Sequence, residues 1–215
     1  LPYWVRHQPV WLLLFSGSLF ALLLPFSCYV AAIPFVRMEW DMGNTMSAVV
    51  YSGFFLGYAV SALLVLPLTD KFAPTKILLS FAVVCLVSNV IFPMVATGFL
   101  GAFCLRVITG MGLVGVYMPG LRVIAHTVPA ERKAAAMGFF VMSFYLASGV
   151  SLLASGLLLD YLSWRVVYLI LAIVALVSLP LFYVTLKSDL GMKPASNSKW
   201  LIDINVLRFS KAQIG

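Results

Sequence analysis

The chain has 215 residues, of which 63% are hydrophobic and 10% are charged, and its formal net charge is +7. With a mean hydropathy of +1.06, it has too little polar surface to cover a water-soluble domain. This composition excludes a soluble enzyme, a disordered chain and a disulfide-stapled secreted domain, and it indicates a membrane protein. The three cysteines lie in apolar runs and are expected to be buried, inert thiols: Cys28, Cys85 and Cys104.

Six long apolar runs are separated by charged and turn residues. A helix needs about 20 apolar residues to cross about 30 Å of hydrocarbon, and the runs lack the alternating pattern of transmembrane strands. The sequence therefore predicts an all-α fold, a polytopic membrane bundle in residues 1–187, followed by a cytoplasmic loop or linker in residues 188–215. The six predicted transmembrane helices cover residues 10–34, 46–68, 77–97, 99–122, 135–159 and 165–187.

The basic residues lie between the apolar runs and not along one soluble face, which argues against nucleic acid and for a lipid bilayer as the partner. If the N-terminus is cytoplasmic, only Arg37 and Arg165 face outside. This distribution satisfies the positive-inside rule and predicts a multi-pass protein of the cell (inner or plasma) membrane, with both ends of this segment in the cytoplasm. The residues expected inside are Arg6, Lys71, Lys76, Arg122, Arg132, Lys133, Lys187, Lys193, Lys199, Arg208 and Lys211.

The first three predicted helices match the last three at an offset of 90 residues, which defines repeats at about 10–97 and 99–187. In the clearest stretch, residues 66–72 pair with residues 156–162, and Asp70 matches Asp160. Because each repeat has three spans, the second must cross the membrane in the opposite sense. Inverted repeats of this kind are typical of secondary transporters.

The loop after the second run holds Asp70 and Lys71, followed by Lys76. A carboxylate at a cytoplasmic helix end can pair with cations in one conformation and release them in another. The segment resembles the loop between helices 2 and 3 of the major facilitator superfamily, Gly-x-Leu-x-Asp-Arg-x-Gly-Arg-Arg, although Leu66 and Ala73 replace its glycines. The alternative is that these charges only solvate a turn. The expected gate consists of Asp70, Lys71, Lys76 and Arg132.

The fourth run contains Arg106, the one basic residue well inside a predicted span. A charge at such depth must face a partner or a watery cavity, and a guanidinium can bind an anion through two parallel hydrogen bonds. The alternative is that Arg106 binds backbone carbonyls or extends toward the outer face. This stretch resembles the Arg-x-x-x-Gly-x-Gly pattern of helix 4 in the same superfamily. Gly110, Gly112 and Gly115 are expected at close helix contacts.

The fifth run has small residues at regular spacing, among them Ser151 and Gly156, which are expected to serve helix packing. Their spacing is similar to the helix 5 motif of the superfamily's proton-coupled antiporters, although Leu152 replaces its proline. No Asp or Glu lies inside a predicted span. An apolar central cavity with Arg106 and a few tyrosines would suit a small organic anion. The tyrosine candidates for substrate binding are Tyr29, Tyr51, Tyr117 and Tyr145.

The sequence contains no phosphate-binding Gly-x4-Gly-Lys loop, no nucleophile with a base at usable spacing and no metal cluster, so neither an enzyme nor a cofactor is expected. Over nearly its whole length the chain resembles the N-terminal half of a major facilitator transporter. This resemblance implies half of a twelve-helix fold, completed by a C-terminal half of the same protein or by a second copy.

The function implied by the resemblance is secondary active transport by alternating access, for a small organic or inorganic anion, with a proton or sodium as the coupling ion. Two alternatives stay open. One is a proton-coupled efflux antiporter for amphipathic compounds, and the other is a non-transporting membrane scaffold or receptor.

Overall fold

The computed structural model describes residues 8–187, except for the side chains at positions 66, 67, 69 and 70. Within this range helices follow one another with short connections, which confirms the expected all-α fold. Residues 188–215, predicted to form a cytoplasmic loop or linker, lie outside the described part. The helices are α2 (Gln8–Leu23), α3 (Cys28–Trp40), α4 (Asn44–Lys71), α5 (Pro74–Val95), α6 (Phe99–Thr127), α7 (Ala130–Leu159), α8 (Trp164–Ala175) and α9 (Ser178–Leu186).

Six spans among the described residues are long and apolar enough to cross a membrane, as predicted. The first span is interrupted between α2 and α3, where Pro25 lacks the N–H that a continuous helix would use. The last span is interrupted between α8 and α9, where the carbonyl of Leu176 would clash with the ring of Pro180, four residues later, in a continuous helix. The first span also runs on to Trp40, beyond its predicted end at residue 34, because Pro34 is accommodated inside α3.

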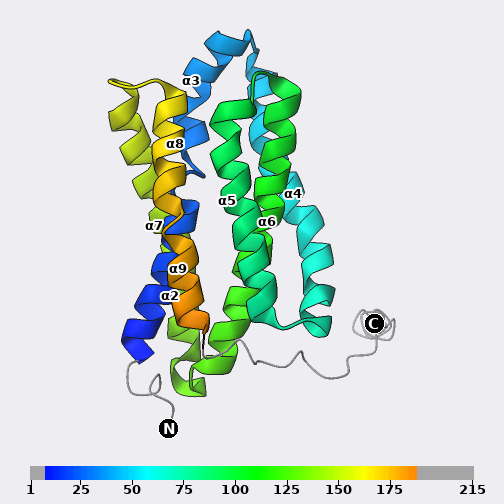
Figure 1. Ribbon diagram of the computed structural model, residues 1–215, viewed down its shortest axis with the longest axis vertical. Helices are drawn as coiled ribbons and strands as arrows, with labels where there is room; N and C mark the ends of the chain where they lie inside the picture. The colour runs from blue at the N-terminus through cyan, green and yellow to red at the C-terminus, as the bar shows by residue number, and fades with distance from the viewer. Residues whose placement is uncertain (1–7, 188–215) are drawn as a thin grey trace, which may run out of the picture.

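The six spans form two groups of three. Each group contains two helices from one predicted repeat and one helix from the other. α6 packs against α4 and α5, whereas the first span packs against α7 and against the α8–α9 span, and Figure 1 shows the two groups side by side. In the predicted repeats the first span corresponds to α6, so each repeat places its first helix among the last two helices of the other. The inverted relation between the two repeats stays a prediction.

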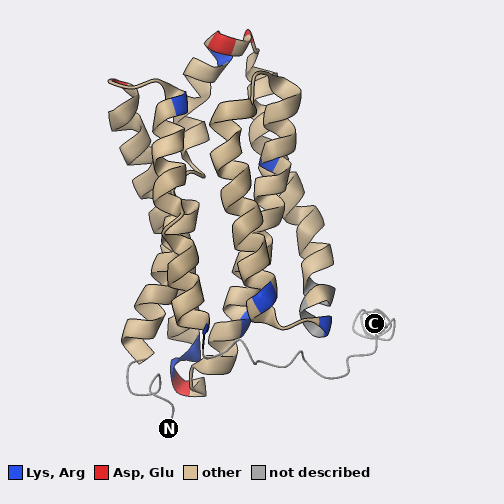
Figure 2. Cartoon of the chain, viewed as in Figure 1, with Lys and Arg blue, Asp and Glu red and all other residues tan. Residues whose placement is uncertain are grey.

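Charged residues lie mostly at the two ends of the bundle, as the coloured cartoon in Figure 2 shows. The end of α4 and the beginning of α7 bring Lys71 and Arg132 to one end. The end of α3 and the beginning of α8 bring Glu39 and Arg165 to the other end. Between these ends the described helices are almost entirely uncharged, and Arg106 is the exception.

Glycines set the close approach of α4 and α6. A Cβ atom added at Gly110 would lie 2.0 Å from the carbonyl oxygen of Phe54, and one added at Gly57 would lie 2.0 Å from the carbonyl oxygen of Val107. The two helices therefore meet backbone to backbone, which requires residues without a side chain at the crossing.

The other residues expected at helix contacts divide into two kinds. A Cβ atom added at Gly112 would lie 2.8 Å from the nearest atom of α5, and one added at Gly115 would lie 2.0 Å from the nearest atom of that helix. Ser151 is fully buried. At Gly156 an added Cβ would meet no atom within 4 Å, so the described structure does not place it against a neighbouring helix. The expectation of a buried Cys104 is wrong, because an apolar run does not reveal which of its positions face outward.

Candidate functional site

A cavity of about 400 Å³ lies between α4, α6 and α7, beside the break in the first span. We call it the aromatic cavity because eight of its nine lining residues are phenylalanine or tyrosine, and none of the nine is charged. Its lining residues are Phe26, Tyr51, Phe54, Phe55, Tyr58, Tyr117, Phe144, Tyr145 and Ser148.

The rings around the aromatic cavity contact one another and form a continuous wall. The centroid of the Phe26 ring lies 4.5 Å from that of Phe54 and 6.0 Å from that of Phe144. Phe144 in turn lies 6.1 Å from Tyr117 and 5.4 Å from Tyr145. Such a wall offers π faces and apolar surface, with tyrosine hydroxyls as its hydrogen-bonding groups.

Of the four tyrosines expected in the central cavity, the structure brings together three: Tyr51, Tyr117 and Tyr145. Tyr29 does not line the aromatic cavity but is fully buried. The expected set also omitted the phenylalanines and Ser148. A signal for part of this wall exists in α4, because aromatic residues at i, i+3, i+4 and i+7 share one helix face. These residues are Tyr51, Phe54, Phe55 and Tyr58.

Arg106 is fully buried and is not among the residues that line the aromatic cavity. Its two terminal nitrogens donate to the carbonyl oxygen of Phe26 at 3.4 and 3.3 Å. The guanidinium carbon lies 4.4 Å from the centroid of the Tyr29 ring and 5.7 Å from that of Phe92, within the range of cation–π attraction. Among the described side chains, no carboxylate pairs with Arg106, and its Nε has no hydrogen-bond partner.

The break in the first span explains why the carbonyl of Phe26 is available to Arg106. In a continuous helix the N–H of Val30 would bond to that carbonyl, but here it donates to the carbonyl of Ser27 at 3.1 Å. The hydroxyl of Ser27 also lies 2.5 Å from that of Ser148 in α7. Arg106 and Ser148 therefore hold the break from two sides, directly beside the aromatic cavity.

The residues of the expected gate lie at the end of the bundle where α4 ends and α7 begins. Lys71, Lys76 and Arg132 are exposed there. Asp70 belongs to the last turn of α4, but its side chain lies outside the described part of the structure. The geometry of a latch around this carboxylate therefore stays a prediction.

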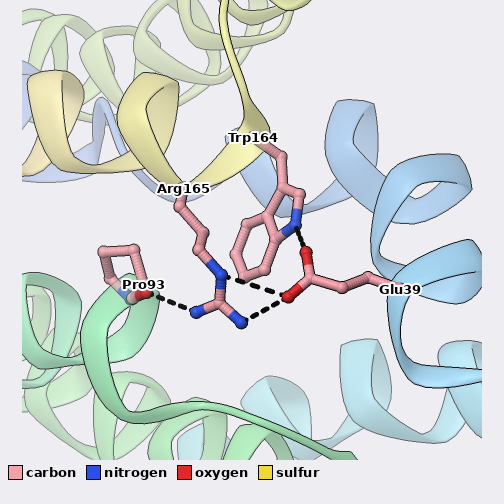
Figure 3. A network of polar contacts seen from close by, with 4 residues as sticks. All are labelled: Glu39, Pro93, Trp164 and Arg165. Carbon is pink, nitrogen blue, oxygen red and sulfur yellow. Dashed lines mark hydrogen bonds and ion pairs between the residues drawn. The ribbon is translucent and has the colours of Figure 1, made fainter.

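At the opposite end, Glu39 joins three helices in a polar network that sequence reasoning missed, as Figure 3 shows. Arg165 of α8 donates to Oε1 of Glu39 from Nη2 at 2.6 Å and from Nε at 3.2 Å. The indole of Trp164 donates to the other carboxylate oxygen at 2.5 Å. Arg165 also donates to the carbonyl of Pro93 at 2.6 Å. That carbonyl lies in the last turn of α5, where carbonyls lack helical partners.

We expect Arg165→Gln to lower the free energy of unfolding by about 1–2 kcal/mol, because it removes a partly exposed ion pair together with the bond to the end of α5. Side-chain exposures of 30% for Arg165 and 42% for Glu39 keep this value small. Thermal melting in detergent measures the effect, with Arg37→Gln as the control, since Arg37 bonds to the carbonyl of Met42 in its own connection. Equal losses in the two variants would argue against a network that joins three helices.

Comparison with known proteins gives the family. The sequence model described as Major Facilitator Superfamily matches residues 15–211. The inner membrane transport protein YnfM of Escherichia coli strain K12 is 24% identical over 193 residues, which are 89% of this chain and 45% of that protein. The probable sulfoacetate transporter SauU of Cupriavidus necator is 25% identical over 67% of this chain and 34% of its own length.

A solved structure shows the same fold. The bacterial homologue of the human lysosomal transporter Spinster, in an inward-facing and unoccupied conformation, matches 95% of this chain with a TM-score of 0.69 at 15% identity. The match covers 48% of that transporter, and the chain likewise spans less than half the length of the curated relatives named above. The match from residue 15 to residue 211 covers nearly all of the sequence, and the chain belongs to the Major Facilitator Superfamily.

Proposed function

We propose that the chain forms one half of a secondary active transporter that works by alternating access, and that its aromatic cavity holds the apolar or aromatic body of an amphipathic substrate. The observation that carries this proposal is the lining of the cavity, in which eight of nine residues are aromatic and none is charged. Such a surface favours a substrate with a large apolar area and a few polar groups. In this proposal a second six-helix half, from the same protein or from a second copy, closes the cavity, and a proton or sodium gradient drives transport.

A small organic anion is the second candidate substrate. Arg106 favours it because its Nε has no partner, and the relative from Cupriavidus necator is named a probable sulfoacetate transporter. Against it stands the position of Arg106, whose guanidinium is fully buried and already binds the carbonyl of Phe26. An anion would reach Arg106 only if the packing of Tyr29 or the break in the first span were rearranged.

The aromatic cavity can be tested with tetraphenylphosphonium, an aromatic cation, because tyrosine and phenylalanine faces attract such ions. We expect Tyr145→Ala, in the protein at its natural length, to weaken binding about tenfold, the equivalent of about 1.4 kcal/mol. Tyr161→Ala is the matched control, because both tyrosines are largely exposed, at 69% and 86%, and only Tyr145 lines the cavity. Calorimetry in nanodiscs measures both affinities.

Sulfoacetate serves as the comparison probe in the same measurement. The proposal expects it to bind more weakly than tetraphenylphosphonium and to be insensitive to Tyr145→Ala. Tight binding of sulfoacetate, together with unchanged binding of tetraphenylphosphonium by both tyrosine variants, would favour the anion candidate and overturn the amphipathic one.

We also propose that the end of the bundle with Lys71, Lys76 and Arg132 faces the cytoplasm, since basic residues concentrate on that side of membrane proteins. Single cysteines at position 76 and at position 161 test this orientation in a Cys104→Ser background, because Cys28 and Cys85 are buried. A membrane-impermeant maleimide added to intact cells should label position 161 and leave position 76 unlabelled until the membrane is opened. The reverse labelling pattern would invert the proposed orientation.

A further inference from the structure

A second cavity, of about 320 Å³, lies between the beginning of α2 and the beginning of α7 and shares no residue with the aromatic cavity. We call it the α2–α7 groove. Its apolar lining includes Leu12 of α2 together with Ala135 and Phe139 of α7. Its polar lining residues are Gln8 and Arg132. An apolar trough thus has a single cation at the end of the bundle where basic residues gather (Figure 2).

The charge of the α2–α7 groove is positive. Arg132 is the one charged residue among those that line it, and this side chain is exposed. α7 begins without a side-chain cap, so the positive end of its dipole adds to the charge of Arg132. Glu131 lies in the same first turn but does not line the groove.

We propose that the α2–α7 groove binds an anionic phospholipid, with the phosphate of the headgroup on Arg132 and part of an acyl chain against Leu12, Ala135 and Phe139. Charge complementarity supports this occupant, because basic pockets between transmembrane helices on the cytoplasmic side attract anionic headgroups. A guanidinium can bind two phosphate oxygens through parallel hydrogen bonds. The apolar trough beside it matches the chemistry of the chain that is attached to that headgroup. The inference rests on the proposed membrane orientation and is independent of the proposed substrate.

The groove can be tested by native mass spectrometry of the protein at its natural length, with phosphatidylglycerol and phosphatidylcholine as the two lipid probes. Arg132→Gln should weaken phosphatidylglycerol binding about tenfold and phosphatidylcholine binding by a smaller factor, because the choline ammonium offsets the phosphate charge of phosphatidylcholine. Lys133→Gln is the matched control, because it removes the same charge from the next residue, which does not line the groove, and it should weaken binding less than threefold.

A second variant tests the apolar part of the groove. Ala135 is exposed and lines the groove, so Ala135→Leu should fill the trough without disturbing the core, and it should weaken binding of both lipids. Equal binding of phosphatidylglycerol by the wild type, Arg132→Gln and Ala135→Leu would overturn the proposal. A lower melting temperature of Ala135→Leu without lipid, with lipid binding unchanged, would also overturn it, because a protein segment would then fill the groove.

These outcomes are separate from those of the substrate test. Lipid binding measured in this way requires neither transport nor tetraphenylphosphonium, and none of the three substituted residues lines the aromatic cavity. A failure of the substrate proposal would therefore leave the lipid result interpretable, and the reverse also holds.

Discussion

Changing Gly110 to alanine is expected to destabilise the protein by about 3 kcal/mol or more and to remove most of the folded product from the membrane. The added Cβ would lie 2.0 Å from the carbonyl oxygen of Phe54 and 3.0 Å from the backbone nitrogen of Tyr58. Both atoms belong to the backbone of α4, so no side chain can turn away to make room. The two helices would have to separate, which would also stretch the bond from Ser61 to the carbonyl of Met111.

Fluorescence-detected gel filtration and thermal melting measure this effect, and Gly156→Ala provides the matched control. Both glycines lie inside long apolar helices, but a Cβ at Gly156 would meet no atom within 4 Å. We expect Gly156→Ala to be neutral or slightly stabilising, because alanine favours a helix by about 1 kcal/mol over glycine. If both alanine variants fold equally well, the backbone contact between α4 and α6 does not limit the packing.

Changing Arg106 to alanine is expected to abolish transport and to lower the free energy of unfolding by about 3 kcal/mol, while insertion into the membrane is preserved. The substitution leaves the carbonyl of Phe26 without its partner in an apolar interior, which costs about 1–3 kcal/mol. It also leaves a space beside the rings of Tyr29 and Phe92. The break in the first span lies beside the aromatic cavity. A change in the conformation of the break should therefore also displace the residues that line the cavity.

Two further variants separate charge from packing at this position. Arg106→Lys retains one donor for the carbonyl of Phe26 but lacks the planar group over Tyr29, so we expect reduced transport and an intermediate melting temperature. Arg106→Met fills the space without a donor and should fail to transport. Transport by Arg106→Ala at the wild-type rate in proteoliposomes would show that the contact at the break has no functional part.

Some of the architecture could be predicted because it depends on local composition. Length and apolarity are enough to locate a helix that crosses a bilayer, so all six spans were found among the described residues. The position of Arg106 deep inside an apolar run also indicated a special role for this charge, and in the structure its side chain is fully buried. Its binding to a backbone carbonyl was the alternative interpretation of the sequence.

The contacts across the bundle could not be predicted in the same way. A soluble helix reveals its inner face by the alternation of apolar and polar residues, but a membrane helix is apolar on all sides. The exposure of Cys104 and the open position of Gly156 follow from helix rotations that this composition leaves undetermined. The pairing of Glu39 with Arg165 joins residues 126 positions apart and requires the relative placement of α3 and α8.

The sequence by itself thus determined the membrane environment and the six spans, because hydrophobic burial and backbone hydrogen bonding act within each helix. Only the tertiary structure decided which rings form the aromatic cavity and that Arg106 binds the carbonyl of Phe26 instead of lining that cavity. These features depend on how each helix is rotated and how closely it approaches its neighbour. Rotation and approach are set by small residues, helix breaks and polar contacts between segments that are distant in the chain.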